Sequence, residues 1–275
     1  MSLHRAARYG CALHFQIIDS REHVMKKNMK KAFLIAALST LFCAQAAASV
    51  VIGATRIVFP SNEREVSVRL TNEGSTPSLI QTWFDKGDAN AQPDATPVPF
   101  VLTPPLFRLD PAKGQTLRVI HTKEAMPQDR ESVYWLNVLE IPPKPKDGEA
   151  DDSNFMQMAF RIRIKLFYRP KDLNKQVLLD KAPSQVVWKV VADEKAAGYV
   201  VEASNPTPYH INFTKVALNI SGKEMADEVG GMVEPFGKLH VVVKGLNSQP
   251  ANAKVTYTLL NDYGASVTED ATLAH

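Results

Sequence analysis

Cysteine is absent from the chain after residue 48, because the only two cysteines among 275 residues are Cys11 and Cys43. The first 48 residues combine a basic stretch at 25–31, an apolar run at 32–42 and small residues at 44–48. This order is typical of a secretory signal peptide, and the apolar run is too short to span a bilayer. We therefore expect an exported protein that has no disulfide framework and relies on sizeable hydrophobic cores.

The expected leader has two parts. Residues 1–24 precede Met25 and Met29, either of which can serve as the start of translation, so residues 1–24 are interpreted as an N-terminal extension. The signal peptide follows, and we expect it to be removed with the extension so that the mature chain begins near Ser49. We predict no stable membrane insertion of the mature protein.

An excess of basic side chains is also missing once the leader is set aside. Residues 1–48 hold seven Lys or Arg against two Asp or Glu, and the remainder holds 25 against 27, a formal charge of −2. The formal charge of +3 of the whole chain is therefore due to the leader. No basic face for nucleic-acid binding is expected.

Patterns that carry catalysis or bind metals are missing as well. The histidines after residue 48 do not have the paired spacing of a metal-binding helix or a zinc finger; they are His121, His210, His240 and His275. The same part of the chain has no nucleophile elbow, no phosphate-binding glycine loop and no dinucleotide fingerprint. We predict that the protein is not an enzyme and uses no metal or other cofactor.

What the chain does contain is a series of short alternating apolar runs separated by Pro, Gly and Asn, with no long amphipathic helix. Before residue 170 the runs are at 66–70, 79–84, 98–102, 117–119 and 133–138, and after it at 186–191, 199–201, 211–213, 216–220, 239–243 and 255–259. Short strands at this spacing predict an all-β fold. Two sets of a little over a hundred residues each predict two β-sandwich domains in series, 49–170 and 171–275.

The run from Phe155 to Pro170 places its apolar residues on one side of an extended chain. These residues are Met156, Met158, Phe160, Ile162 and Ile164, whereas Gln157, Arg161, Arg163 and Lys165 lie on the other side. The preceding segment 142–155 is rich in proline and charge and is predicted to be a mobile loop. An unpaired apolar strand beside such a loop aggregates unless a partner or a second copy, in a self-capping dimer, covers it.

The stretch Met126–Pro142, MPQDRESVYWLNVLEIP, resembles the signature of the periplasmic pilus chaperones of the chaperone/usher pathway. Ile164–Pro170 (IKLFYRP), Asn205–His210 (NPTPYH) and Asn261–Gly264 (NDYG) are similar to further segments of that family in the expected order. The resemblance implies two immunoglobulin-like domains in a boomerang arrangement with a cleft between them. It also implies a protein of the Gram-negative periplasm that binds pilin or fimbrial subunits and delivers them to an outer-membrane usher.

The family mechanism implied by the resemblance is donor-strand complementation, in which the chaperone lends a strand to a pilin subunit whose own fold lacks one. This is β-augmentation: backbone ladders give affinity and alternating side chains fill pockets. The positions that match the family's inserted residues are Met156, Met158, Phe160 and Ile162. Methionines suit a surface that meets subunits of different shapes.

Two further sets of residues take their roles from the resemblance. Arg56 and Lys165 match the basic pair that holds the C-terminal carboxylate of the subunit, for which a planar guanidinium and a compact ammonium are complementary. Glu131, Arg169 and Asp262 match an internal ion-pair network between the domains. We treat them as surface pairs, each worth about 0 to 1 kcal/mol. They are therefore expected to fix the angle between the domains more than to stabilise the fold.

Two other classes remain open from the residues alone. A fimbrial subunit or adhesin would have a polymerising N-terminal donor segment and usually a disulfide. A secreted carbohydrate-active enzyme would have paired carboxylates in an aromatic groove. The acidic residues of this chain gather mainly at 147–152, where a solvated loop is the simpler interpretation.

Overall fold

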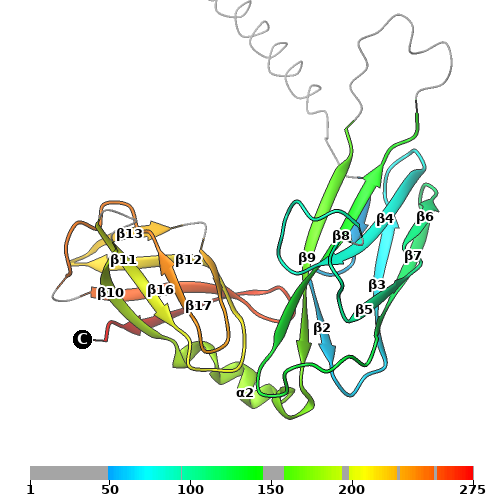
Figure 1. Ribbon diagram of the computed structural model, residues 1–275. Coiled ribbons are helices and arrows are strands. Elements are labelled where there is room, and N and C mark those ends of the chain that lie inside the picture. Colours follow the sequence, from blue (N-terminus) through cyan, green and yellow to red (C-terminus); the bar gives the residue numbers. More distant parts are fainter. Residues whose placement is uncertain are drawn as a thin grey trace, which may run out of the picture. The chain divides into compact units, whose positions relative to one another are not determined.

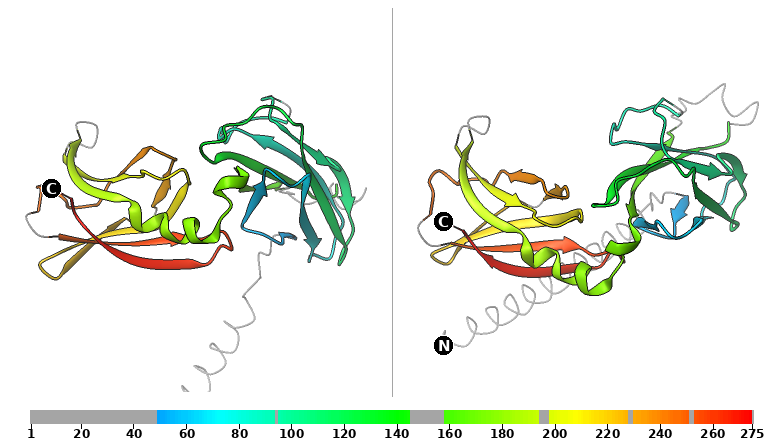
Figure 2. Two further views of the ribbon diagram at one scale, coloured as in Figure 1. Left: turned by 90° about the horizontal axis from the view of Figure 1, so that it is seen from below. Right: turned by 60° about the horizontal axis from the view of Figure 1, so that its bottom comes forward.

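The structure is a computed structural model, and it describes residues 49–93, 95–144, 158–193, 198–227, 230–250 and 253–274. It is built mostly from β-strands, which confirms the predicted all-β class. The strands fall into two groups with separate hydrophobic cores, one formed by residues from Val50 to Tyr168 and the other by residues from Val186 to Leu259. Each group forms a sandwich of two sheets (Figures 1 and 2).

The N-terminal sandwich packs two sheets over one core. The first sheet has the order β1 (Val50–Ile52), β3 (Glu65–Asn72), β7 (Gly114–His121) and β5 (Phe100–Thr103). The second has the order β2 (Arg56–Pro60), β9 (Phe160–Arg169), β8 (Ser132–Ile141), β4 (Ser78–Asp85) and β6 (Leu106–Leu109). The apolar sides of alternating strands from both sheets supply the core.

The C-terminal sandwich is built in the same way. One sheet has the order β10 (Val187–Asp193), β11 (Gly198–Ser204) and β15 (Lys238–Val241). The other has the order β13 (Lys223–Asp227), β12 (Ile211–Ile220), β16 (Ala253–Leu260) and β17 (Ser266–Thr272), with β14 (Gly231–Val233) also paired to β12. The rings of Trp188, Phe213 and Tyr257 pack on one another with centroids 5.1 to 5.6 Å apart at its centre.

A short helical segment joins β9 to β10. It contains η1 (Lys171–Leu173), α2 (Gln176–Lys181) and η2 (Pro183–Gln185), and none of its residues had been predicted to be helical. Six residues are too few to produce a clear helical periodicity in the sequence. Among the described residues, no helix has the length and apolar character needed to cross a bilayer.

The apolar residues at the start of the described chain form two strands rather than one. β1 pairs with β3 in the first sheet and β2 pairs with β9 in the second, so the chain changes sheets between them. Gly53 lies at the crossing, where its N–H donates to the carbonyl of Arg69 at 2.8 Å. Because Val50 and Phe59 are both buried in the same core, the hydrophobic pattern is continuous although the strand is not.

Strand β9 changes its surroundings along its length. It pairs with β8 from Phe160 to Tyr168, but with β2 only from Lys165 to Arg169. Every residue from Leu166 to Arg169 is buried, whereas Phe160 at the start of the strand is exposed. The predicted strand therefore exists, with one half inside the sheet and one half at its edge (Figure 1).

Candidate functional site

The first component of the site is the free half of β9, Phe160–Ile164. On one side these residues pair with β8, and on the other side no strand of the described chain pairs with them. A strand edge presents unpaired backbone N–H and C=O groups, which another extended chain can use. The free half of β9 is therefore a place where an incoming strand can extend the sheet.

The apolar side of this free half is partly open to solvent. Phe160 is 46% exposed, Ile162 is half-buried and Ile164 is 8% exposed against the core, while Met158, two residues before β9, is 57% exposed. Exposure thus rises steadily away from β2. The remaining predicted donor residue, Met156, lies outside the described residues. So does most of the predicted loop 142–155.

The second component is a pair of cations at the point where β2 meets β9. Arg56 lies directly opposite Lys165 in the parallel ladder between the two strands. The Lys165 ammonium donates to the side-chain oxygen of Asn212, and Arg56 Nη1 donates to the carbonyl of Leu260 at 3.0 Å. The Arg56 Nε–H is buried and has no hydrogen-bond partner in the structure. A buried donor without a partner is costly, so an anion that reached it would be bound favourably.

The electrostatics of the pair also favour an anion. Burial, followed by the charge of the neighbouring Arg56, lowers the pKa of Lys165 below its ordinary value of 10.5. Burial likewise lowers the pKa of Arg56, against the opposing effect of the Asp262 carboxylate. Two adjacent and poorly hydrated cations gain from a negative charge placed between them.

The third component is a buried ion network that includes the three predicted residues Glu131, Arg169 and Asp262. Arg169 Nε donates to Glu131 at 2.7 Å, and Arg169 Nη1 and Nη2 donate to Asp262 at 2.7 and 3.0 Å. His210 is a fourth member, because its backbone N–H donates to Glu131 Oε2 at 2.8 Å and its Nδ1 lies 3.3 Å from the same oxygen. The sequence places His210 only among histidines without metal-binding spacing, so its role in this network comes from the structure.

The expectation that these are surface pairs is wrong. Only 4% of the Arg169 side chain and 2% of the Glu131 side chain are exposed. Burial alone would lower the pKa of Arg169, but hydrogen bonds and charges from Asp262 and Glu131 raise it. A buried pair that loses one partner leaves an uncompensated charge, which costs about 3 to 5 kcal/mol rather than the fraction expected at a surface.

Arg56 and the ion network line one cavity. Its volume is about 280 Å³, and its lining includes Arg56, Glu131, Arg169, Tyr209 and Asp262. The structure thus brings together residues from five separate sequence segments, which the linear sequence could group only through motif resemblance. No group of histidine, cysteine or carboxylate side chains that could hold a metal ion occurs among the described residues.

Comparison with known proteins gives matches in both halves of the chain. The model of the pili and flagellar-assembly chaperone PapD N-terminal domain matches residues 49–174, and that of the pili assembly chaperone PapD C-terminal domain matches residues 181–271. The chain is 40% identical over 233 residues to the probable fimbrial chaperone YadV of Escherichia coli K12, covering 84% of this chain and 93% of YadV. It is 38% identical over 255 residues to the chaperone protein FimB/FhaD of Bordetella pertussis, covering 90% and 98%.

Solved structures agree with the sequence matches. The crystal structure of the Pseudomonas aeruginosa CupB2 chaperone is similar with a TM-score of 0.67 and 38% identity, covering 82% of this chain and all of that one. The crystal structure of the YadV chaperone is similar with a TM-score of 0.69 and 37% identity, with the same coverage.

Proposed function

Because this chain belongs to the family of pili assembly chaperones, we propose that it is an exported chaperone that binds pilin subunits by donor-strand complementation and delivers them to an outer-membrane usher. Fimbrial chaperones are periplasmic in general. Export of this chain through the signal peptide at 25–48, with the mature protein starting near Ser49, is part of the proposal. So is the division into an N-terminal domain at 49–170 and a C-terminal domain at 171–275.

The observation that carries the proposal is the free half of β9. It begins with exposed apolar side chains near Phe160 and leads to the basic pair at Lys165. A subunit strand that paired with Phe160–Ile164 would complete backbone hydrogen bonds that β2 leaves open. Met156, Met158, Phe160 and Ile162 would then fill the subunit's groove. The subunit's last residue would lie near Arg56 and Lys165, whose charges suit a terminal carboxylate.

The family matches do not favour the two alternative classes. They are to assembly chaperones rather than to fimbrial subunits or adhesins, and the family is one of chaperones rather than enzymes. In the proposed mechanism neither a nucleotide nor a metal takes part. The folding free energy of the subunit drives its release, when a strand of the next subunit replaces the chaperone strand.

The proposal is tested by changing one exposed side chain of the donor strand. Phe160→Asp places a charge where an apolar contact is required, so we expect loss of pilin subunits from the chaperone recovered from the periplasm, measured by pull-down and mass spectrometry. Val101→Asp is the matched control, since Val101 is 49% exposed on the other sheet of the same sandwich. Equal recovery of subunits by both variants would contradict the donor-strand assignment.

The lowered pKa of Lys165 predicts a pH dependence of subunit binding. A bound carboxylate favours the charged ammonium and raises the pKa of Lys165 in the complex, so binding is strongest below the pKa of the free chaperone and weakens as pH rises through it. We expect the fall in affinity to begin at a lower pH than the ordinary lysine pKa of 10.5 would give. Lys165→Arg, which keeps its charge throughout, should flatten the profile in titration calorimetry. An identical fall in both proteins would exclude Lys165 as its cause.

A further inference from the structure

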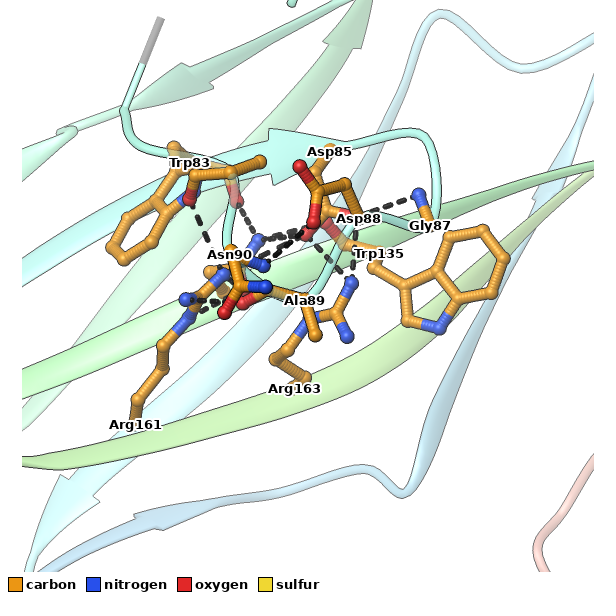
Figure 3. A network of polar contacts seen from close by, with 11 residues as sticks. Trp83, Asp85, Gly87, Asp88, Ala89, Asn90, Trp135, Arg161 and Arg163 are labelled. Carbon is orange, nitrogen blue, oxygen red and sulfur yellow. Dashed lines mark hydrogen bonds and ion pairs between the residues drawn. The ribbon is translucent and has the colours of Figure 1, made fainter. Parts of the chain in front are cut away.

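The arginines on the polar side of the free half of β9 interact with one buried carboxylate on β4. Asp85, at the end of β4, has a side chain with no exposed surface, and Arg163 Nη2 donates to its two oxygens at 2.6 and 2.8 Å. Arg161 Nη2 lies 3.8 Å from the same carboxylate. The two arginines alternate with Phe160 and Ile162 and so lie on the opposite side of the strand. Figure 3 shows both of them directed toward Asp85 and its neighbours.

The surroundings of Asp85 fix its orientation. The Asn137 amide donates to Asp85 Oδ2 at 2.7 Å, and the Gly87 N–H donates to Oδ1 at 2.7 Å. Asn137 in turn accepts from Arg161 Nε at 2.8 Å and from Nη2 at 2.6 Å. The carboxylate on β4, the amide on β8 and the guanidinium groups on β9 therefore form one continuous network across three strands.

Each arginine is also held against a tryptophan. The Arg161 guanidinium lies 4.7 Å from a ring centroid of Trp83, and that of Arg163 lies 5.8 Å from a ring centroid of Trp135. Arg161 Nη1 further donates to the carbonyl of Ala89 at 2.7 Å. Only 25% of the Arg161 side chain and 22% of that of Arg163 are exposed. Both arginines are therefore held largely within the protein rather than freely solvated.

The network lies where β9 lacks a second neighbour. From Lys165 onward, β2 holds the strand by backbone pairing, but from Phe160 to Ile164 only β8 and these side chains do so. We propose that Asp85 is a positioning residue for the donor strand: through Arg163 and Arg161 it keeps the free half of β9 extended, with its apolar side chains presented to the subunit. A donor strand ordered in advance spares the complex the entropy cost of ordering it. This inference rests on the proposed function.

The test compares Asp85→Asn with Asp110→Asn, a control on the same sandwich whose carboxylate forms an exposed pair with Arg108. The processed protein is examined by amide hydrogen exchange and by its affinity for the pilin subunit that wild type retains in the pull-down. For Asp85→Asn we expect exchange at 160–164 to rise at least about tenfold while β3 and β7 change little, and subunit affinity to fall at least about tenfold. The control should change neither.

Arg163→Lys provides a second variant that keeps the charge but cannot bond both carboxylate oxygens in a fork. We expect faster exchange confined to the same residues. Exchange that rises equally in all strands of the sandwich, or stays unchanged at 160–164, would overturn the inference. If wild type retains no subunit, the proposed function fails, and the exchange measurement still decides whether Asp85 orders the strand.

A second and independent observation concerns Glu140, a buried carboxylate at the end of β8. It accepts hydrogen bonds from the Ser49 hydroxyl, from the Val50 N–H at 3.2 Å and from the Ser78 hydroxyl at 2.9 Å. No lysine, arginine or histidine pairs with it among the described residues. Buried carboxylates are ordinarily paired with a positive charge.

Cleavage before Ser49 would create a positive charge beside Glu140, namely the new α-ammonium group. We infer that Glu140 binds the α-ammonium group of the processed chain, which adds an ion pair to the hydrogen bonds that already link the start of β1 to β8. This rests on the proposed processing. N-terminal sequencing of the periplasmic protein must give Ser49 as its first residue, and any other start would overturn the inference.

The ion pair itself is tested by a double-mutant cycle. Protein beginning at Ser49 is compared with protein that retains Ala48, each with Glu140 or with Glu140→Gln. We expect the extra alanine to lower the melting temperature when Glu140 is present and to have a much smaller effect in Glu140→Gln. The same shift in both backgrounds would show that no such ion pair forms.

Discussion

Replacing Arg169 with alanine is expected to lower the free energy of unfolding by about 3 to 5 kcal/mol, because it leaves the carboxylate of Glu131 buried without its cation. Asp262 is less affected, since 33% of its side chain is exposed and water can replace part of the lost interaction. Urea unfolding followed by tryptophan fluorescence measures the change.

The control for Arg169 is Arg108→Ala, which breaks an exposed pair with Asp110. We expect a change within about 1 kcal/mol there. Glu131→Gln offers a milder test at the same network, since it removes one charge but keeps the shape of the side chain and one of the two oxygens that accept from Arg169 and His210. A loss for Arg169→Ala no greater than that for Arg108→Ala would contradict the view that the network is a buried structural element.

The double variant Arg56→Ala, Lys165→Ala is expected to abolish stable subunit binding while the protein stays folded. Each cation would contribute a charge-assisted hydrogen bond worth about 1.5 to 3 kcal/mol, so losing both should weaken binding at least about hundredfold. The fold should persist because the pair consists of two like charges whose burial is unfavourable in the free protein. Titration calorimetry with the purified subunit measures the effect.

A charge-matched control is available for the double variant. Arg108→Ala, Lys113→Ala removes two exposed cations from the same sandwich, and we expect it to bind the subunit as wild type does. Retained binding by Arg56→Ala, Lys165→Ala would show that the basic pair is not the carboxylate anchor. Equal weakening by both double variants would indicate that overall charge, rather than this site, attracts the subunit.

The sequence predicted the strand that carries the site and the direction of its side chains, but not how that strand pairs with its neighbours. Alternation in β9 correctly separated its apolar side from its polar side, because side-chain direction follows directly from strand geometry. Periodicity does not reveal which strand pairs with which, so neither the free half of β9 nor the register of Arg56 opposite Lys165 could be obtained from it. Motif resemblance selected those two residues, and the fold places them side by side.

The sequence did not indicate which charged side chains are buried. Alternation placed Arg161 and Arg163 on the side opposite the apolar residues, but their partners Asp85 and Asn137 lie more than twenty residues away and no local pattern links them. Similarly, the Glu131 network had been treated as a set of surface pairs. The hydrogen-bond partners of a charged side chain depend on contacts between distant segments, which a single sequence does not contain.

Hydrogen exchange of the chaperone with and without a bound pilin subunit tests the central claim most directly. If the subunit adds a strand to the free edge of β9, amides at 160–164 will become protected in the complex, while those at 165–169, already paired with β2, will change little. Protection that appears elsewhere in the chain and leaves residues 160–164 unchanged would contradict donor-strand complementation by this strand.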